Sequence, residues 1–145
     1  MTAPVHALLI RHGRAEPQGS GGDAARRLTP EGRDRFAALA RRLAPRLPVR
    51  RVVSSPYARA RETADLLAAA LDAEVEEDSR LGSGESDGAR LLALARRLGP
   101  GVALVGHNPE LAQALALAGG REVDVPPGTV GAIDTEGRLL WVETG

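Results

Sequence analysis

The sequence predicts an α/β fold in which strands and helices alternate around a mostly parallel sheet. Two observations support this fold class. Short apolar runs alternate with amphipathic stretches along the chain, as in folds whose strands and helices pack in layers. The chain has 145 residues, the size of one ordinary domain, and can bury about two-thirds of the surface that it exposes when unfolded. We therefore expect a single domain over residues 1–145.

The first half of the chain begins with an apolar strand at residues 5–10, followed by a loop rich in Gly and Ser through Gly22. The stretch "LTPEGRDRFAALARRLAP" is then typical of an amphipathic helix. Thr29 is a suitable N-cap, the next residue is a proline that suits a first helical turn, and Pro45 ends the helix.

The remaining elements continue the alternation, with prolines on both sides of the second strand. The pattern predicts a strand at 50–55, a helix at 58–71, a weaker strand at 74–77, a helix at 89–98, a buried strand at 101–106, a helix at 108–119, and two final strands at 129–134 and 139–143.

Composition narrows the classes of function. The chain has 19 basic residues, all arginine, and 19 acidic ones, so the formal net charge is zero and any anion site must be local. Three aromatic residues offer almost no platform for stacking bases, so we expect no nucleic-acid partner. There is no cysteine, which excludes disulfides, thiolate metal sites and cysteine nucleophiles.

The first ten residues, "MTAPVHALLI", carry no basic region and only a short apolar run. They fit neither a signal peptide nor a transmembrane span. We expect a cytoplasmic protein with no membrane partner, and a monomer.

Three predicted strands end in polar side chains, in "LLIRHG", "VVSSPYARARET" and "VALVGHN". Ligands of parallel α/β sheets bind at the carboxyl ends of the strands. Residues far apart in the chain can therefore meet there, namely Arg11, His12, Ser54, Ser55, Arg59, His107 and Asn108. Two imidazoles and at least two guanidiniums form a positive pocket suited to phosphate.

These residue types suit phosphoryl transfer. An arginine fork binds two phosphate oxygens at once and stays charged at any working pH. A neutral histidine nitrogen attacks phosphorus and carries the phosphoryl group covalently. Neighbouring cations lower the pKa of that histidine, and a second histidine donates to a non-bridging oxygen.

The motifs "RHG", "SSPYARARETA" and "VGHNPEL", in this order, resemble those of the histidine phosphatase superfamily. The segment "RHGRAE...DAARRLTPEGR" and the lack of a long inserted helical subdomain resemble the small bacterial phosphohistidine phosphatases in particular. The resemblance covers residues 8–111. It implies the phosphoglycerate-mutase-like fold, a three-layer α/β/α sandwich with a mostly parallel central sheet.

The resemblance also implies roles for four residues. His12 is the phosphorylated nucleophile, Arg11 and Arg59 bind the phosphate, and His107 is the second histidine of the pocket. No metal and no cofactor are expected. Gly13, which has no side chain, would let the backbone pass close to the anion.

The proton donor of larger family members has no clear counterpart here. Glu85 in "GSGESDG" is the nearest candidate, with Glu62 and Glu16 behind it. A phosphohistidine substrate needs less acid catalysis, because its leaving group is an imidazole.

Simpler interpretations apply to the other polar residues. Arg61 points about 200° away from Arg59 around the helix and is interpreted as structural. Arg14 is interpreted as a solvated loop residue, although it would also extend the pocket. Ser55 is expected to cap the helix after it, as Ser54 and Ser55 are most often turn or cap residues. His6 is expected to face outward or to be a satisfied polar residue.

The leading hypothesis is thus a metal-independent phosphatase for phosphohistidine or another phosphorylated protein side chain. The alternatives are a phosphatase for small phosphomonoesters and a non-catalytic module that binds phosphate or a phosphoprotein. A zinc site built from His6, His12 and His107 has too few well-spaced ligands.

Overall fold

The computed structural model describes residues 4–17 and 21–145. Six strands form one sheet in the order β3-β2-β4-β1-β5-β6. They are β1 (Ala7–Arg11), β2 (Arg51–Ser54), β3 (Glu74–Glu77), β4 (Val102–Gly106), β5 (Thr129–Ile133) and β6 (Leu139–Thr144). The four strands from β3 to β1 are parallel to one another, and β5 is antiparallel to both of its neighbours. The sheet is mostly parallel, as the resemblance implied.

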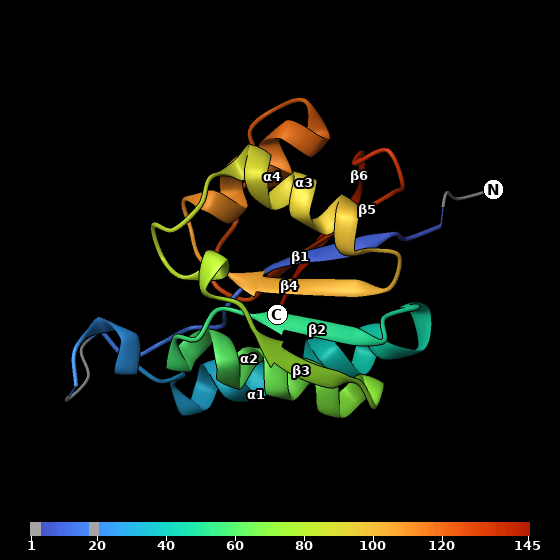
Figure 1. The fold of residues 1–145 in the computed structure, drawn as a ribbon. Coiled ribbons are helices and arrows are strands. Elements are labelled where there is room, and N and C mark those ends of the chain that lie inside the picture. The colour runs from blue at the N-terminus through green and yellow to red at the C-terminus, as the bar shows by residue number, and fades with distance from the viewer. Residues whose placement is uncertain (1–3, 18–20) are drawn as a thin grey trace.

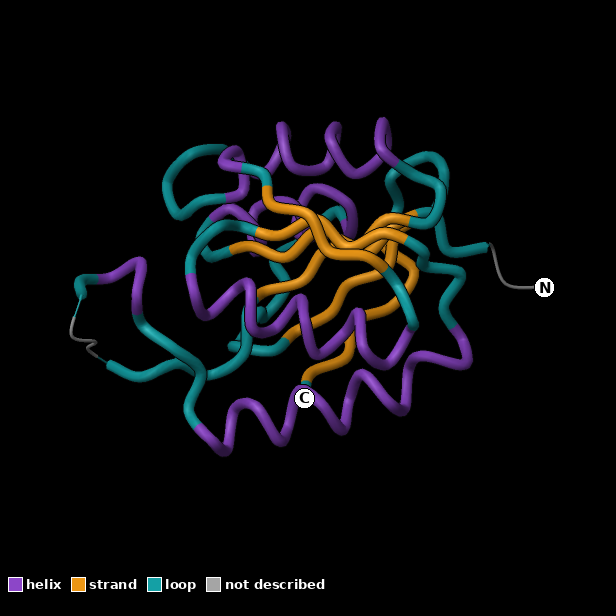
Figure 2. Tube along the Cα trace, turned by 60° about the horizontal axis from the view of Figure 1, so that its bottom comes forward, coloured by secondary structure: helices purple, strands orange, loops and turns teal. Residues whose placement is uncertain are grey.

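Helices cover both faces of this sheet (Figures 1 and 2). One layer holds α1 (Pro30–Leu43) and α2 (Ala58–Leu71), and the opposite layer holds α3 (Gly88–Leu98) and α4 (Glu110–Gly119). The expected three-layer α/β/α sandwich is therefore confirmed.

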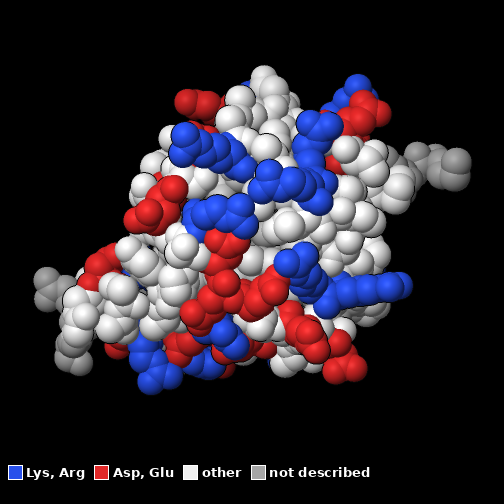
Figure 3. Space-filling view, viewed as in Figure 1, with Lys and Arg blue, Asp and Glu red and all other residues white. Residues whose placement is uncertain are grey.

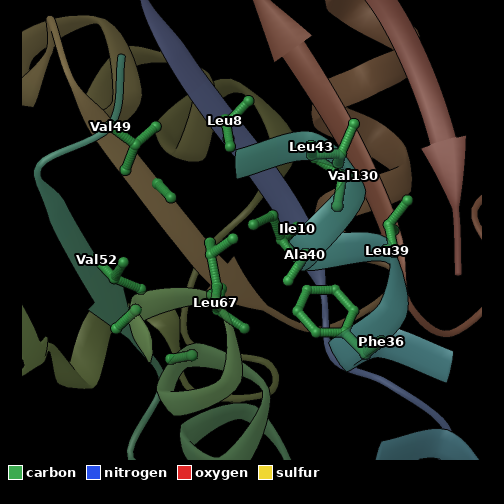
Figure 4. Packing of buried hydrophobic residues seen from close by; sticks show 14 of the residues in the cluster. Leu8, Ile10, Phe36, Leu39, Ala40, Leu43, Val49, Val52, Leu67 and Val130 are labelled. Carbon is green, nitrogen blue, oxygen red and sulfur yellow. The ribbon is translucent and has the colours of Figure 1, made fainter. Parts of the chain in front are cut away.

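Each helical layer packs on its own apolar cluster. On the α1 and α2 side, Phe36 and Leu39 of α1 meet Ile10 of β1 and Leu67 of α2 (Figure 4). On the α3 and α4 side, a second cluster is made largely of Leu and Val, together with Ala and one Ile. Because β1 and β4 lie inside the sheet and are buried on both faces, they consist largely of continuous apolar residues.

The parallel register brings three strand ends to one edge of the sheet. Arg11 pairs with Gly106, and Ser54 pairs with Val105. The ladder continues one step further, where the His12 N–H donates to the Gly106 carbonyl oxygen at 3.1 Å. The residues that follow β1, β2 and β4 therefore begin at the same edge.

Most predicted elements are confirmed, and α2 and β3 have the predicted bounds. The first strand is shifted from 5–10 to Ala7–Arg11, because Arg11 still pairs with β4. The first helix ends at Leu43, and a 3₁₀ helix, η2 (Ala44–Arg46), contains the proline expected to end it. The last helix begins at Glu110 and not at 108.

The loop after β1 contains short regular structure that the sequence did not predict. A 3₁₀ helix, η1 (Asp23–Ala25), lies in it, and Ala15 forms an isolated bridge with Leu28. Part of the predicted loop, residues 18–20, lies outside the described residues. No helix of the described segments is long and apolar enough to cross a membrane.

Candidate active site

His12 follows β1 directly and is buried, with 7% of its surface exposed. Its Nδ1 lies 2.7 Å from the Gly13 carbonyl oxygen. A carbonyl oxygen only accepts, so Nδ1 carries the proton and Nε2 keeps a lone pair. Burial lowers the pKa of His12 to about 3. The hydrogen bond to Gly13 opposes this shift, and the charges of His107, Arg59 and Arg11 add to it. A neutral imidazole with an unprotonated Nε2 is the form that can attack phosphorus.

His107 follows β4 and lies beside His12, with 5.2 Å between the ring centroids. Its Nε2 lies 2.8 Å from Ser55 Oγ, and its Nδ1 is buried without a partner in the described part of the chain. Burial, and then the Arg59 charge, lower the pKa of His107 to about 4. The predicted pair of imidazoles is therefore brought together from strand ends far apart in the sequence.

Arg59 lies in the first turn of α2 and is buried, with 4% of its surface exposed. Its Nε–H donates to His12 Nε2 at 3.3 Å, so the guanidinium sits on the reactive nitrogen. A cation in this position is placed to bind the oxygens of a phosphoryl group on Nε2.

Arg11 is the last residue of β1 and is partly buried. Its Nη1 donates to the Val125 carbonyl oxygen at 3.0 Å, and its Nε is buried without a partner among the residues described. Burial, and then the nearby Arg59 charge, lower the pKa of Arg11. The structure thus places Arg11, His12, Arg59 and His107 at one edge of the sheet.

Gly13 was expected to let the backbone pass close to an anion, and in the structure its backbone binds two side chains of the site. Its N–H donates to Thr63 Oγ1 at 3.0 Å, and its carbonyl oxygen fixes the His12 ring. Thr63 Oγ1 in turn donates to the Arg59 carbonyl oxygen at 2.8 Å, so it connects the first and second motifs. A close approach of the Gly13 backbone to an anion stays a prediction.

In the described part of the chain, none of the carboxylates named from the sequence hydrogen-bonds to the four proposed pocket residues. Glu85 is exposed and lines a hollow on the outer side of α3, together with Arg80, Arg90 and Arg97. Glu62 binds Arg27, Arg33 and the Leu28 N–H. The Glu16 carboxylate accepts from the Arg27 N–H at 3.1 Å. A role for Glu85 as proton donor stays a prediction.

One acidic residue at the pocket, Asp23, was missed by sequence reasoning. Its Oδ2 accepts from Arg59 Nη2 at 3.1 Å, and its Oδ1 accepts from Arg26 Nη1 at 2.9 Å. Asp23 and Arg59 are 36 positions apart, and the path of an irregular loop brings them together. The only local signal was the spacing of Asp23 and Arg26.

Ser55 was also misjudged. It does not cap α2, whose N-cap residue is Tyr57. Its Oγ instead accepts from the Tyr57 N–H at 3.1 Å and contacts His107. Ser55 is therefore a direct neighbour of the proposed phosphate-binding histidine.

Three further residues have side chains that do not hydrogen-bond to the pocket residues in the described segments. His6 is buried, and its Nε2 contacts the Arg96 carbonyl oxygen at 2.9 Å, so the outward-facing alternative is wrong. It precedes β1 whereas His12 follows it, so these histidines lie at opposite ends of one strand. Arg61 forms ion pairs with Asp65 and Glu77, as expected of a structural residue. Arg14 is exposed.

The sheet order, the flanking helices and the cluster of imidazoles and guanidiniums define a class of protein, and comparison with known families identifies it. The family model of the histidine phosphatase superfamily (branch 1) matches residues 7–85. The chain belongs to this superfamily. The sequence-based expectation of a hydrolase of the phosphatase type is confirmed at this level.

Solved structures share the whole fold at low sequence identity. The protein histidine phosphatase SixA complexed with tungstate is 22% identical, with a TM-score of 0.82 and 96% of each chain covered. A structure from Agrobacterium tumefaciens assigned to the phosphohistidine phosphatase SixA is 23% identical, with a TM-score of 0.84 and coverages of 98% and 99%.

A more distant likeness is the phosphoserine phosphatase of Entamoeba histolytica in complex with 3-phosphoglyceric acid. It is 17% identical, with a TM-score of 0.68 and 97% of each chain covered. No curated protein sequence matches the chain.

Proposed function

We propose that the protein is a metal-independent phosphatase that hydrolyses phosphohistidine on a protein, through a covalent intermediate at His12. One observation carries this proposal. Near the unprotonated His12 Nε2, two buried nitrogens, Arg11 Nε and His107 Nδ1, have no partner in the described segments. Buried polar groups are almost always paired. The oxygens of a phosphoryl group would pair with both.

In the first step, the His12 Nε2 lone pair attacks phosphorus, and the bond from phosphorus to the substrate nitrogen breaks with its electron pair. The proton stays on His12 Nδ1, which donates it to the Gly13 carbonyl oxygen as a hydrogen bond, so the phosphorylated ring becomes cationic. Arg11, Arg59 and His107 offset the charge on the three phosphoryl oxygens. Placement and positive charge supply most of the catalysis in such a transfer.

In the second step, a water oxygen bonds to phosphorus, and the bond to His12 Nε2 breaks. The electron pair returns to Nε2, and both water protons end on the released phosphate. The neutral His12 is restored, ready for another cycle. No step needs a redox partner.

The leaving group favours phosphohistidine over an oxygen ester. An imidazole leaves more readily than an alkoxide, which needs a proton donor. Asp23, the carboxylate that contacts Arg59, is bound by two guanidiniums and is no such donor. The similarity to SixA structures also favours this substrate.

A second candidate is a phosphatase for small phosphomonoesters, favoured by the likeness to the phosphoserine phosphatase. A third is a module that binds phosphate without turnover. Rates on a phosphohistidine protein and on a panel of sugar and nucleotide phosphates separate the first two. Binding of tungstate without hydrolysis of any substrate would identify the third.

The test measures hydrolysis of a phosphohistidine protein and of 4-nitrophenyl phosphate, each with and without a chelator. We expect turnover that the chelator does not change. His12→Ala should lower kcat by at least about 10³-fold, because the nucleophile is lost. Rapid acid quench should detect an acid-labile phosphoryl group on the wild-type protein and none on His12→Ala.

Two arginine variants provide a matched control. Arg59→Ala should lower kcat/KM by about 10²-fold or more, since it removes a charged donor at the phosphate. Arg61→Ala, two positions along the same helix, loses surface ion pairs and should stay within about threefold of wild type. Absence of turnover by folded wild-type protein on every substrate would overturn the proposal.

A further inference from the structure

Asp23 lies at the entrance of the site, and the mechanism above gives it no role. Its side chain is 58% exposed, whereas the Arg59 side chain that it binds is 5% exposed. Arg59 in turn contacts Nε2 of His12, which is also buried. His12 and Arg59 are therefore both buried, and Asp23 is the exposed member of the three.

The Arg59 guanidinium presents different edges to its two neighbours. Nη1 donates to the Asp23 carbonyl oxygen at 2.7 Å, and Nη2 donates to the Asp23 carboxylate at 3.1 Å. Nε points to His12 instead. One guanidinium thus separates the nucleophile from the Asp23 carboxylate. Asp23 is also close enough to His107 that its negative charge raises the pKa of His107 against the larger effects that lower it.

In-line transfer places the leaving group opposite the nucleophile. Because His12 attacks from the buried side, the leaving group emerges on the exposed side, where Asp23 lies. Both Asp23 oxygens accept from guanidiniums, which have no lone pair to accept a proton in return. Asp23 is therefore an anion that accepts hydrogen bonds. The Arg26 hydrogen bond lowers the pKa of Asp23 most; burial opposes this, and Arg59 lowers the pKa further.

We propose that Asp23 determines specificity for an N–H-bearing leaving group, by accepting a hydrogen bond from the far ring nitrogen of the substrate's phosphohistidine. This inference rests on the proposed function. The substrate imidazole leaves as a neutral ring when its far nitrogen keeps a proton. The bond from phosphorus to the substrate nitrogen breaks as the bond to His12 Nε2 forms, and neither ring loses its far proton.

The two rings are then held in equivalent ways. The Gly13 carbonyl holds the far N–H of His12, and the Asp23 carboxylate holds the far N–H of the leaving imidazole. An alkoxide leaving group has no such donor and develops negative charge near an anion. Asp23 therefore favours phosphoramidates of imidazole and disfavours alkyl phosphates.

The test compares kcat/KM of wild type and Asp23→Asn on a phosphohistidine peptide and on 4-nitrophenyl phosphate. The phenolate leaves without an acid and carries no N–H, so it has no hydrogen bond to Asp23 to lose. We expect about a tenfold fall on phosphohistidine, the effect of a charged hydrogen bond, and less than a threefold change on the aryl phosphate. The matched control is Asp65→Asn, an exposed carboxylate that also pairs with an arginine of α2, which should change neither rate.

An equal loss on both substrates would mean that Asp23 only positions Arg59, and would overturn the inference. So would unchanged rates on both. Asp23→Ala should show the same selective loss as Asp23→Asn, because the Asp23 backbone carbonyl still holds Arg59. If wild type hydrolyses the aryl phosphate but not phosphohistidine, the proposed function fails, and the inference that depends on it fails with it.

Discussion

The two imidazoles of the site are held in different ways by their neighbours. His12 Nδ1 faces a carbonyl oxygen, which fixes its proton away from the nucleophilic nitrogen. His107 Nε2 faces a hydroxyl, which can donate or accept. Whether the Ser55 hydroxyl donates or accepts depends on its second hydrogen bond, to Tyr57. Because the Tyr57 N–H donates to Ser55 Oγ, the hydroxyl proton is free to point at His107 Nε2. The His107 proton then lies on Nδ1, the nitrogen without a partner.

This chain of donors gives a prediction for Ser55. Ser55→Ala removes the donor to His107 Nε2, so the Nδ1–H tautomer loses population and kcat/KM should fall about tenfold. Nitrogen chemical shifts of His107 in a histidine-labelled sample report the tautomer directly. Ser54→Ala is the control, because this buried neighbour donates to the Ser55 carbonyl oxygen and not to His107. An unchanged tautomer with an unchanged rate would contradict the interpretation.

At the scale of elements, α3 packs closely on α4. The two helices meet at a glycine, Gly88, the first residue of α3. A Cβ there would lie 2.5 Å from Gln113 Cβ and 2.6 Å from the Ala114 backbone nitrogen. Real Cβ atoms essentially never come so close, and a backbone atom cannot rotate away.

Gly88→Ala should therefore push α3 and α4 apart. We expect the free energy of unfolding to fall by about 1–3 kcal/mol, as for overpacked cores, in urea denaturation followed by circular dichroism. Gly119→Ala, at the far end of α4, is the control, since its Cβ would meet the end of the Leu139 side chain at 3.1 Å. It should change stability by less than about 0.5 kcal/mol. Equal stability of Gly88→Ala and wild type would show that the helices shift freely.

Regular elements could be predicted because their signals are local. The helix Ala58–Leu71 and the strand Glu74–Glu77 have the predicted bounds, and polar residues after apolar runs indicated the site. The features that the sequence did not predict depend on contacts between residues far apart in the chain. Arg11 extends β1 because Gly106 pairs with it. The contacts of Asp23 depend on the path of a loop rich in Gly and Ser, which has no periodicity to analyse.

The whole molecule has no net charge, yet its charges are unevenly placed. On the face in Figure 3, arginines gather over α3 and carboxylates over the region of β3. The proposed site adds a separate concentration of positive groups, drawn from Arg11 in β1, Arg59 in α2 and His107 after β4. Because it combines both halves of the sequence, we propose that residues 1–145 act as one domain.

Burial of two neutral histidines links the stability of the whole fold to pH. The folded pKa values of His12 and His107 are about 3 and about 4, whereas an unfolded chain has values near 6.5. Between these values the unfolded state binds more protons, so acid favours unfolding. The stabilisation is complete above about pH 6.5 and decreases as the pH falls towards 4. Carboxylates with lowered pKa values, such as Asp23 and Asp78, lose their contribution at lower pH.

The histidine effect can thus be isolated between pH 7 and pH 5. Each buried histidine should cost about 2 kcal/mol over this interval, at about 1.4 kcal/mol for each pH unit below the unfolded pKa. Urea denaturation in phosphate-free buffer should show that the free energy of unfolding of wild type falls by about 4 kcal/mol, the sum for the two histidines. The double variant His12→Gln, His107→Gln has no proton to take up at these positions and should lose correspondingly less. Equal losses in the two proteins would mean that the site histidines titrate normally when folded, and that His12 is not held as a neutral nucleophile.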